Sequence, residues 1–287
     1  MTKSCFRPIC PQNNLAYTQW WKGPLAEDGV ELSQPEQDEF KCLNLNITVP
    51  QSALNKPRIA SLPVLVFIHG GALIGGSQSI QVSGREIYDP YNLVKASTAM
   101  HKEIIVVTIN YRLGPLGFLA SSALKAFNQS CHESFGNYGL HDQRQALTWI
   151  FKFIRGFGGD PNNVTISGTS AGAVSCHYQA VLPQSQFQRA ICASGSIPTG
   201  AALPLEHHEK YFEALTNALG KTSKRQDQVE LLQSTPVMKL LATLPQPIVY
   251  LVVDGEWLSS SNLYELLSTV KSPPDIILGS CADEVRP

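Results

Sequence analysis

The chain has 287 residues, of which 43% are hydrophobic and 16% charged, so it is long enough to bury one large core or two modest ones. A net charge of -1 and an isoelectric point near 6.6 give no indication of nucleic acid or an anionic membrane as a partner. No apolar run is long enough to span a bilayer, and Met1–Cys5 lacks the apolar core of a signal peptide. The localisation and the oligomeric state of the protein stay open. Without a Cys-x-x-Cys pair or a Cys/His cluster, we expect no metal and no other cofactor.

The first part of the chain is irregular and is followed by two predicted strands. Residues 1–40 are rich in Pro, Gln and Asn and show little periodicity, although Trp20-Trp21 is suited to covering the edge of a core. Leu43–Ile47 alternates apolar and polar residues, which predicts a half-buried strand, and a loop is expected from Gln51 to Pro63. Val64–Ile68 is continuously apolar, as is typical of a strand covered on both faces.

Strand and helix patterns alternate through the rest of the chain, which favours one mostly parallel, twisted sheet with helices on both faces. A helical pattern from Pro204 to Leu244 is interrupted by a polar stretch, Lys221 to Gln228. The other expected strands are Ile104–Ile109, Val164–Ser167, Ala190–Ala193 and Asp275–Gly279, and the other expected helices are Pro90–Lys102, Leu140–Arg155, Ala173–Val181 and Asn262–Val270.

A G-x-S-x-G pattern, Gly168 to Gly172, stands between a β-branched run and a helix of small residues. On such a sharp strand-to-helix turn a serine is lifted clear of the sheet, and the glycines avoid clashes with the neighbouring strand and helix. The turn also places the N–H of Ala171 in the first turn of a helix, where donors are unpaired and an oxyanion is favoured. The pattern is short, and an ordinary glycine-rich turn explains it about equally well.

A second motif, His69-Gly70-Gly71-Ala72, directly follows the buried strand Val64–Ile68. Ligand chemistry gathers at the carboxyl ends of parallel strands, and a glycine-rich loop there can point several N–H groups at one spot. Together with the N–H of Ala171 these donors predict an oxyanion hole, a set of N–H groups that stabilises the negative oxygen of a tetrahedral intermediate. The agreement of the two motifs favours an acyl-transfer site over two unrelated turns.

With these motifs the chain resembles the type B carboxylesterases, the carboxylesterase and cholinesterase group of the α/β-hydrolase fold. The resemblance covers nearly the whole chain from Phe6, and it implies an α/β-hydrolase fold and a serine esterase that acts on a small-molecule ester. The matching segments are Cys10–Gln12, Cys42–Ile47, His69–Ala72, Asn110–Gly114, Gly136–Gln143, Ala146-Leu147, Trp149-Ile150, Phe157–Pro161, Gly168–Ala173, Phe187–Ile191, Asp254-Gly255 and Gly279–Glu284.

The resemblance implies a nucleophile and an acid for the catalytic triad. Ser170 stands at the nucleophile position, and Glu284 falls at the triad acid, which accepts a hydrogen bond from the triad histidine. The chain departs from the family pattern at Thr169, where most members carry glutamate, and at Val285, where the family has glycine. The first departure leaves the subfamily open, and the second leaves an exposed C-terminal carboxylate as an alternative reading of Glu284.

The resemblance also implies the residues that surround the nucleophile. Gly71, Ala72 and Ala171 match the donors of the oxyanion hole, and Ala72 keeps the required N–H where many members have glycine. Gly70 matches the residue that shapes this loop, and Ser194 matches a buried serine that supports the site in relatives.

Cys10 and Cys42 match a disulfide of secreted relatives. A bridge across that separation is worth about 3–4 kcal/mol in the chain-entropy model, whereas in a reducing compartment we expect two free thiols.

The triad histidine has no candidate by chain order. In this fold the order is serine, acid, histidine, but all 7 histidines precede Glu284 and the printed chain ends at Pro287. His69 and His141 lie in motifs interpreted as loops, and His207-His208 opens a polar helix and is expected to be solvated. Residues 1–287 therefore correspond to a single partial domain, about the middle half of the family domain without its C-terminal part. We interpret it as a truncated or mis-spliced product.

Three hypotheses about function follow. The first is an active serine esterase, which requires the absent segment to be supplied. The second is an inactive fragment, and the third is a cholinesterase-like protein that uses the fold to bind partners. An intact Ser170 and two loops suited to an oxyanion argue against the third hypothesis, because binding alone does not need them.

Overall fold

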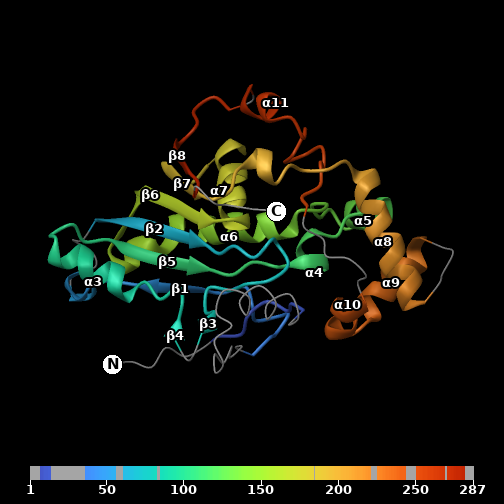
Figure 1. The fold of residues 1–287 in the computed structure, drawn as a ribbon, viewed down its shortest axis with the longest axis horizontal. Coiled ribbons are helices and arrows are strands. Elements are labelled where there is room, and N and C mark those ends of the chain that lie inside the picture. Colours follow the sequence, from blue (N-terminus) through green and yellow to red (C-terminus); the bar gives the residue numbers. More distant parts are fainter. Residues whose placement is uncertain are drawn as a thin grey trace.

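The computed structural model describes residues 7–13, 36–55, 61–82, 85–183, 185–220, 225–243, 250–268 and 270–281. Within these residues a six-stranded sheet has the order β1-β5-β2-β6-β7-β8 (Figure 1). Only β1 is antiparallel to its neighbour, so the predicted mostly parallel sheet is confirmed. The strands are β1 (Leu45–Thr48), β2 (Leu62–Ile68), β5 (Ile105–Ile109), β6 (Gly159–Thr169), β7 (Arg189–Ala193) and β8 (Asp275–Gly279), with a separate pair, β3 (Gln81–Val82) and β4 (Arg85–Glu86).

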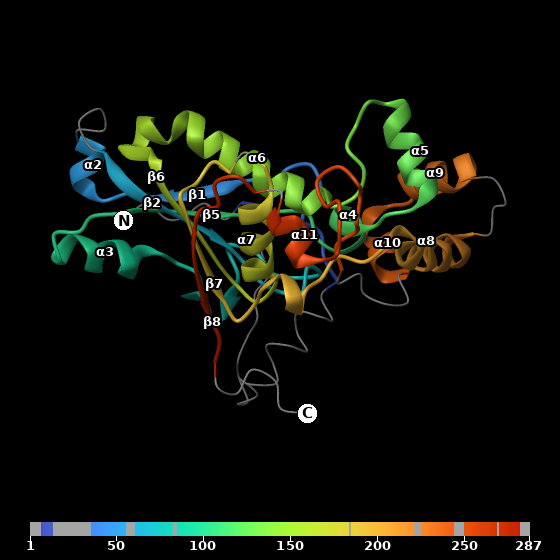
Figure 2. The ribbon, with the colours of Figure 1, turned by 90° about the horizontal axis from the view of Figure 1, so that it is seen from above.

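Helices cover both faces of the sheet. One face carries α6 (Tyr138–Phe153) and α7 (Ala171–Val181), and the other carries α3 (Tyr91–Ala99), as Figure 2 shows. Further helices gather beyond the carboxyl ends of β2 and β5, on the right of Figure 1. The remaining helices are α2 (Gln51–Asn55), α4 (Gly114–Phe118), α5 (Ser122–Ser130), α8 (Leu205–Leu219), α9 (Arg225–Ser234), α10 (Val237–Thr243) and α11 (Leu263–Ser268), and short 3₁₀ turns lie at Ile154–Phe157 and Ile197–Thr199.

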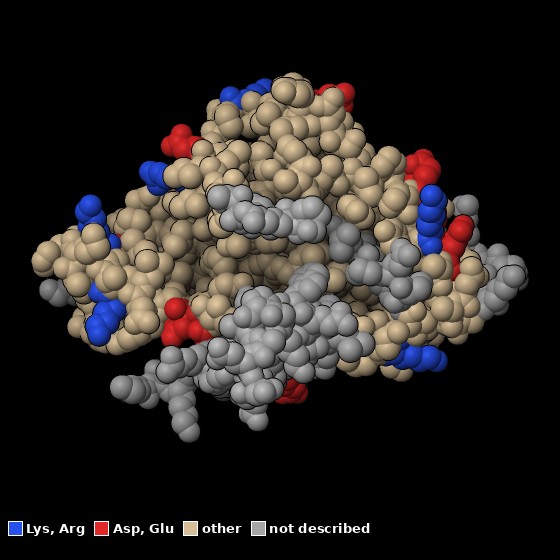
Figure 3. All heavy atoms as spheres, viewed as in Figure 1, with Lys and Arg blue, Asp and Glu red and all other residues tan. Residues whose placement is uncertain are grey.

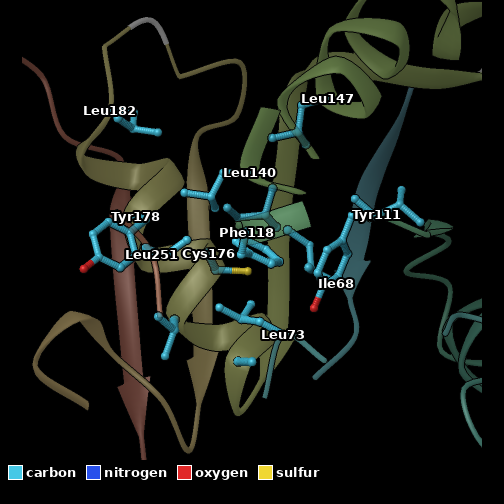
Figure 4. Packing of buried hydrophobic residues seen from close by; sticks show 14 of the residues in the cluster. Ile68, Leu73, Tyr111, Phe118, Leu140, Leu147, Cys176, Tyr178, Leu182 and Leu251 are labelled. Atoms are coloured by element: carbon cyan, nitrogen blue, oxygen red, sulfur yellow. The ribbon is translucent and has the colours of Figure 1, made fainter. Parts of the chain in front are cut away.

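The main core lies between the sheet and the α6–α7 layer. Alternate residues of β2, Val64, Val66 and Ile68, are buried in it, whereas Leu65 and Phe67 on the opposite face are only half-buried. The expectation that this strand is covered on both faces is therefore only half right. Figure 4 shows buried side chains of this core from β2, α4, α6, α7 and connecting loops, namely Ile68, Leu73, Tyr111, Phe118, Leu140, Leu147, Cys176, Tyr178, Leu182 and Leu251.

Some element boundaries differ from those expected. The stretch expected to be a loop from residue 51 contains α2, and β6 begins at Gly159, before the predicted start at Val164. The polar break expected over Lys221–Gln228 is shorter, because α9 begins at Arg225. Trp20-Trp21 lies outside the described residues.

An ion pair fastens the segment after β5 to the start of α6. The guanidinium of Arg112 donates to both carboxylate oxygens of Asp142, over 2.7 and 2.8 Å, and the Arg112 backbone N–H donates to the same carboxylate over 3.0 Å. The Asp142 side chain is only 7% exposed, whereas the Arg112 side chain is 37% exposed. This pair fixes the position of α6 relative to the carboxyl edge of the sheet.

Candidate active site

The register of the sheet brings the two sequence motifs to one edge. Ile68 at the end of β2 pairs with Gly168 in the parallel neighbour β6. The chain therefore leaves both strands at the same level, into the loop His69–Ala72 on one side and into Ser170 on the other. On the face of the molecule that Figure 3 shows, the charged residues lie mainly toward the rim.

Ser170 occupies a strained turn between β6 and α7. Its backbone angles are φ 57° and ψ −125°, a conformation that non-glycine residues rarely adopt. The turn is held by the Ser170 N–H, which donates to Ala193 O over 2.9 Å, and by the N–H of Val174, which donates to Ser170 O over 3.0 Å. The side chains of Ser170 and its neighbour Thr169 are exposed, so the hydroxyl is accessible to a ligand.

The loop after β2 touches this turn at two glycines. A Cβ at Gly70 would lie only 2.5 Å from Thr169 O and 3.2 Å from Ser170 Cβ. A Cβ at Gly172 would lie 2.1 Å from Ile68 O. Since neither position has room for a side chain, glycine permits the close approach of the two backbones. The structure thus brings the predicted nucleophile and the predicted oxyanion loop into contact, and their chemical roles stay predictions.

The candidate donors of the oxyanion hole have no competing acceptor in the described chain. The N–H groups of Gly71, Ala72 and Ala171 donate to no other described residue. Ala72 has a left-handed φ of 49°, and the next residue, Leu73, has a φ of 64°. Leu73 O accepts from the N–H of Gly114 over 2.7 Å, which fixes the middle of the loop.

His69 orients the loop rather than titrating in the neutral range. The ring is completely buried, and its Nδ1 donates to Gly70 O over 2.8 Å. Burial lowers the pKa of His69 to about 4, so the imidazole is neutral near pH 7. Tyr111, two residues after β5, stacks on this ring with centroids 4.5 Å apart, and its hydroxyl donates to His69 O over 2.9 Å. The sequence places Tyr111 in the matching segment Asn110–Gly114 but gives it no role, because no local pattern joins it to a residue 42 positions away.

Ser194 directly follows β7, next to the turn that carries Ser170. Its N–H donates to Gly279 O over 2.7 Å, while the preceding residue, Ala193, accepts from Ser170. The side chain is half-buried, not buried as the resemblance implied, because β8 is the last strand of the described sheet on this side. Glu284, the predicted acid, lies outside the described residues.

Two other histidines differ from expectation. His208 is completely buried and its Nε2 lies 3.1 Å from Leu251 O, so a solvated His207-His208 pair is wrong for His208. His141 lies in the first turn of α6 rather than in a loop, with its ring 3.8 Å from that of Trp257. Within the described residues, no histidine hydrogen-bonds to Ser170.

Cys10 and Cys42 are both buried, and both are free thiols in the structure. They are close enough for their side chains to hydrogen-bond, and this hydrogen bond, together with burial, raises the pKa of Cys10. The proximity that the predicted disulfide requires is therefore present, whereas the bond itself is not formed.

No group of His, Cys, Asp and Glu that could hold a metal ion occurs among the described residues, and none of the helices described is long and apolar enough to cross a membrane.

Comparison with known proteins identifies the family. The model of the carboxylesterase family matches residues 3–286. The chain belongs to the carboxylesterase family. A solved structure of PNB esterase shares the fold with a TM-score of 0.71 at 30% identity, over 96% of this chain and 52% of that one. The predicted α/β-hydrolase fold is therefore confirmed.

The curated relatives are longer than this chain. Para-nitrobenzyl esterase of Bacillus subtilis (strain 168) is 34% identical over 242 residues, which cover 82% of this chain and 42% of the relative. A carboxylic ester hydrolase of Bombus ignitus is 35% identical over 237 residues, 80% of this chain and 38% of the relative. Bile salt-activated lipase of Homo sapiens is 41% identical over 157 residues, 54% of this chain and 19% of the relative. The chain spans less than half the length of these relatives.

Proposed function

We propose that this chain provides the nucleophile and the oxyanion hole of a carboxylic ester hydrolase that works through an acyl-enzyme on Ser170. The observation that carries the proposal is the contact between the strained turn at Ser170 and the loop after β2. This loop and the start of α7 offer the N–H groups of Gly71, Ala72 and Ala171, which have no acceptor among the described residues. Donors fixed in advance at the place where negative charge develops are the largest single contribution in many such sites.

The proposed reaction has two halves. In the first, Oγ of Ser170 bonds to the ester carbonyl carbon and gives its proton to a base, while the π electrons move onto the carbonyl oxygen. The three N–H groups stabilise this oxyanion. When the carbonyl re-forms, the carbon–oxygen bond to the alcohol breaks, and the alcohol leaves with a proton. Water then attacks the acyl-serine in the same way, and the carboxylic acid leaves.

The proton transfers assign the remaining roles. Glu284 is proposed as the acid that orients and stabilises a protonated histidine. Family order places that histidine after Glu284, and none of the 7 histidines of the printed chain stands there. The proposal for this polypeptide therefore concerns formation of the covalent bond at Ser170. Turnover also requires a base, and none of these histidines stands at the position in the chain where the family has its triad histidine.

Covalent labelling tests the proposal. Purified chain is incubated with diethyl 4-nitrophenyl phosphate, whose phosphorus takes the place of the carbonyl carbon. Oγ bonds to phosphorus, the bond to 4-nitrophenolate breaks, and the proton passes to buffer. Intact mass and peptide mapping should show a single label on Ser170, formed slowly because no histidine of the described residues hydrogen-bonds to this serine. The label should be lost in Ser170→Ala and kept in the matched variant Ser130→Ala, which alters an exposed serine on α5.

The competing hypotheses predict a different result. An inactive fragment, or a cholinesterase-like binding protein, has no reason to react preferentially at Ser170. Label spread over several serines, or an equal amount in Ser170→Ala, would contradict the proposed nucleophile.

A further inference from the structure

Gln12 is a buried residue that contacts the end of the oxyanion loop, a name used here for residues 69–76. It has no exposed surface, and its side-chain amide is fully used. Oε1 accepts from the N–H of Gly76 over 2.8 Å, while Nε2 donates to Gly76 O over 3.0 Å and to Cys10 O over 3.1 Å. The amide thus pairs with the Gly76 backbone on both sides, across 64 positions of sequence.

Gly76 in turn lies against the first residues of the loop. Its φ of 104° favours glycine, and a Cβ there would lie 2.6 Å from Gly70 O and 2.8 Å from His69 Nδ1. These two atoms form the hydrogen bond that orients the Gly70 peptide. Gly70 itself is the residue packed on Ser170. A continuous line of contacts therefore runs from Gln12 through Gly76 and Gly70 to Ser170.

The loop needs such support because its backbone is strained. Two neighbouring non-glycine residues, Ala72 and Leu73, have left-handed φ angles of 49° and 64°. Conformations of this kind cost about 1–3 kcal/mol each and persist only where the surroundings fix them. The loop is held at its start by Tyr111 and in its middle by Gly114, as described above. Gln12 holds its end.

The segment that carries Gln12 is itself fixed in place. The N–H of Ile9 donates to Glu36 O over 2.8 Å, and the Gln12 backbone N–H donates to Gln37 Oε1 over 2.8 Å. Because the backbone around Gln12 is fixed, the hydrogen bonds of its side chain can fix the position of the loop that they contact.

We propose that Gln12 is a positioning residue for the oxyanion hole. Its hydrogen bonds to the backbone of Gly76 fix the position of the Gly70–Ala72 peptides relative to Ser170. This inference rests on the proposed function for its chemical meaning, whereas the hold on the loop can be measured without any reaction.

The test compares two buried glutamines of the full chain. Gln12→Met keeps the size of the side chain and removes its hydrogen bonds. Gln179→Met is the matched control, because Gln179 is also completely buried and its amide hydrogen-bonds to Leu140 O and Arg144, but it lies in α7 away from the loop. Hydrogen–deuterium exchange of residues 70–76 gives the first readout, and the rate of labelling of Ser170 by diethyl 4-nitrophenyl phosphate gives the second.

We expect Gln12→Met to speed exchange of the loop amides and to slow labelling by about tenfold or more, since small misplacements of reacting groups cost factors of that order. Gln179→Met should leave both unchanged, even if its melting temperature falls as far. Gln12→Glu keeps an acceptor for the Gly76 N–H, but even when protonated it has one O–H at most for the carbonyl oxygens of Gly76 and Cys10. It is made alongside Gln12→Met, should act like it, and carries the test alone if Gln12→Met does not fold.

The two readouts separate the two proposals. If loop exchange is the same in wild type and both Gln12 variants, or if the Gln179 control loosens the loop equally, the positioning role is overturned. If loop exchange rises but labelling of Ser170 keeps its wild-type rate, the positioning role is overturned as well. If wild type is never labelled at Ser170, the proposed function fails, and exchange alone decides whether Gln12 positions the loop.

Discussion

Four of the seven described non-glycine residues with a positive φ gather at the candidate site. Among described non-glycine residues with a left-handed φ, Ala72, Leu73, Ser170 and Ser194 all lie at the carboxyl edge of the sheet around the serine. Each such residue costs free energy that the rest of the fold must offset. Such a cost in folding free energy is consistent with a site whose donors and nucleophile are held in place before the substrate binds.

His69 should make stability depend on pH. Burial lowers the pKa of this histidine from its usual 6.5 to about 4, so between these values the unfolded chain binds more protons than the folded chain. The free energy of unfolding should therefore fall as pH falls from 6.5, with a share from His69 of about 2.5 kcal/mol by pH 4.5. Urea unfolding at several pH values measures this.

The matched variants for this prediction replace a histidine by asparagine. His69→Asn keeps a donor near Gly70 O but no longer titrates, so its loss of stability in acid should be smaller than in wild type. His132→Asn changes an exposed residue with a left-handed φ of 58°, which asparagine tolerates, and should follow the wild-type curve. Equal acid sensitivity in wild type and His69→Asn would refute the assignment.

At the scale of residues, sequence reasoning found only the parts of the site that lie in local patterns. Ser170 and the glycines of the loop are recognisable because a tight turn demands small residues at fixed spacing. Tyr111 and Gln12 stand in segments that match the family, but their roles could not be found in that way. Tyr111 hydrogen-bonds to backbone 42 positions away, and Gln12 to backbone 64 positions away. Contacts of that range depend on the register of the whole sheet.

Between elements, the Arg112–Asp142 pair should contribute more than its surface counterparts. Its carboxylate is buried and is bound by both the guanidinium and the backbone N–H of Arg112, so Asp142→Ala leaves these donors without a partner. We expect a loss of about 3 kcal/mol in the free energy of unfolding. Lys41→Ala, which removes the exposed pair with Asp38, should cause no measurable change.

A double mutant separates pairing from burial. If the ion pair carries the effect, Arg112→Met combined with Asp142→Leu should cost less than the sum of the single changes, because neither partner is then left buried alone. Strict additivity would contradict this account.

At the scale of elements, the parallel strands were predictable and several short helices were not. Val64–Ile68 is a continuous apolar run and Ile104–Ile109 is apolar except for Thr108, and both are short and rich in β-branched residues, as is typical of buried strands. By contrast, α2 and α4 have five residues each, too few to show a helical period. In α4 four of the five residues are buried, so tertiary packing supports it, and such packing leaves little trace in a local window. In α2 only Ala53 is buried.

For the whole molecule, we predict that the 287-residue polypeptide expressed by itself does not turn over p-nitrophenyl acetate. Without a base the hydroxyl of Ser170 stays a weak nucleophile, and loss of the base alone costs on the order of 10⁶ in kcat in a serine protease. Release of p-nitrophenolate should therefore equal that of Ser170→Ala. Sustained turnover that disappears in Ser170→Ala and is blocked by an organophosphate would show instead that one of the chain's own histidines acts as the base.

The central place of β2 has a consequence for synthesis of the chain. Val66 pairs with Ile166, and these partners are 166 − 66 = 100 positions apart. At about 5–20 residues per second, a ribosome needs roughly 5–20 s to deliver the partner strand after β2 has emerged. During that interval one edge of an almost wholly apolar strand has no partner. Newly made chains should therefore depend on chaperones that bind extended apolar segments, and expression at lower temperature should favour the folded product.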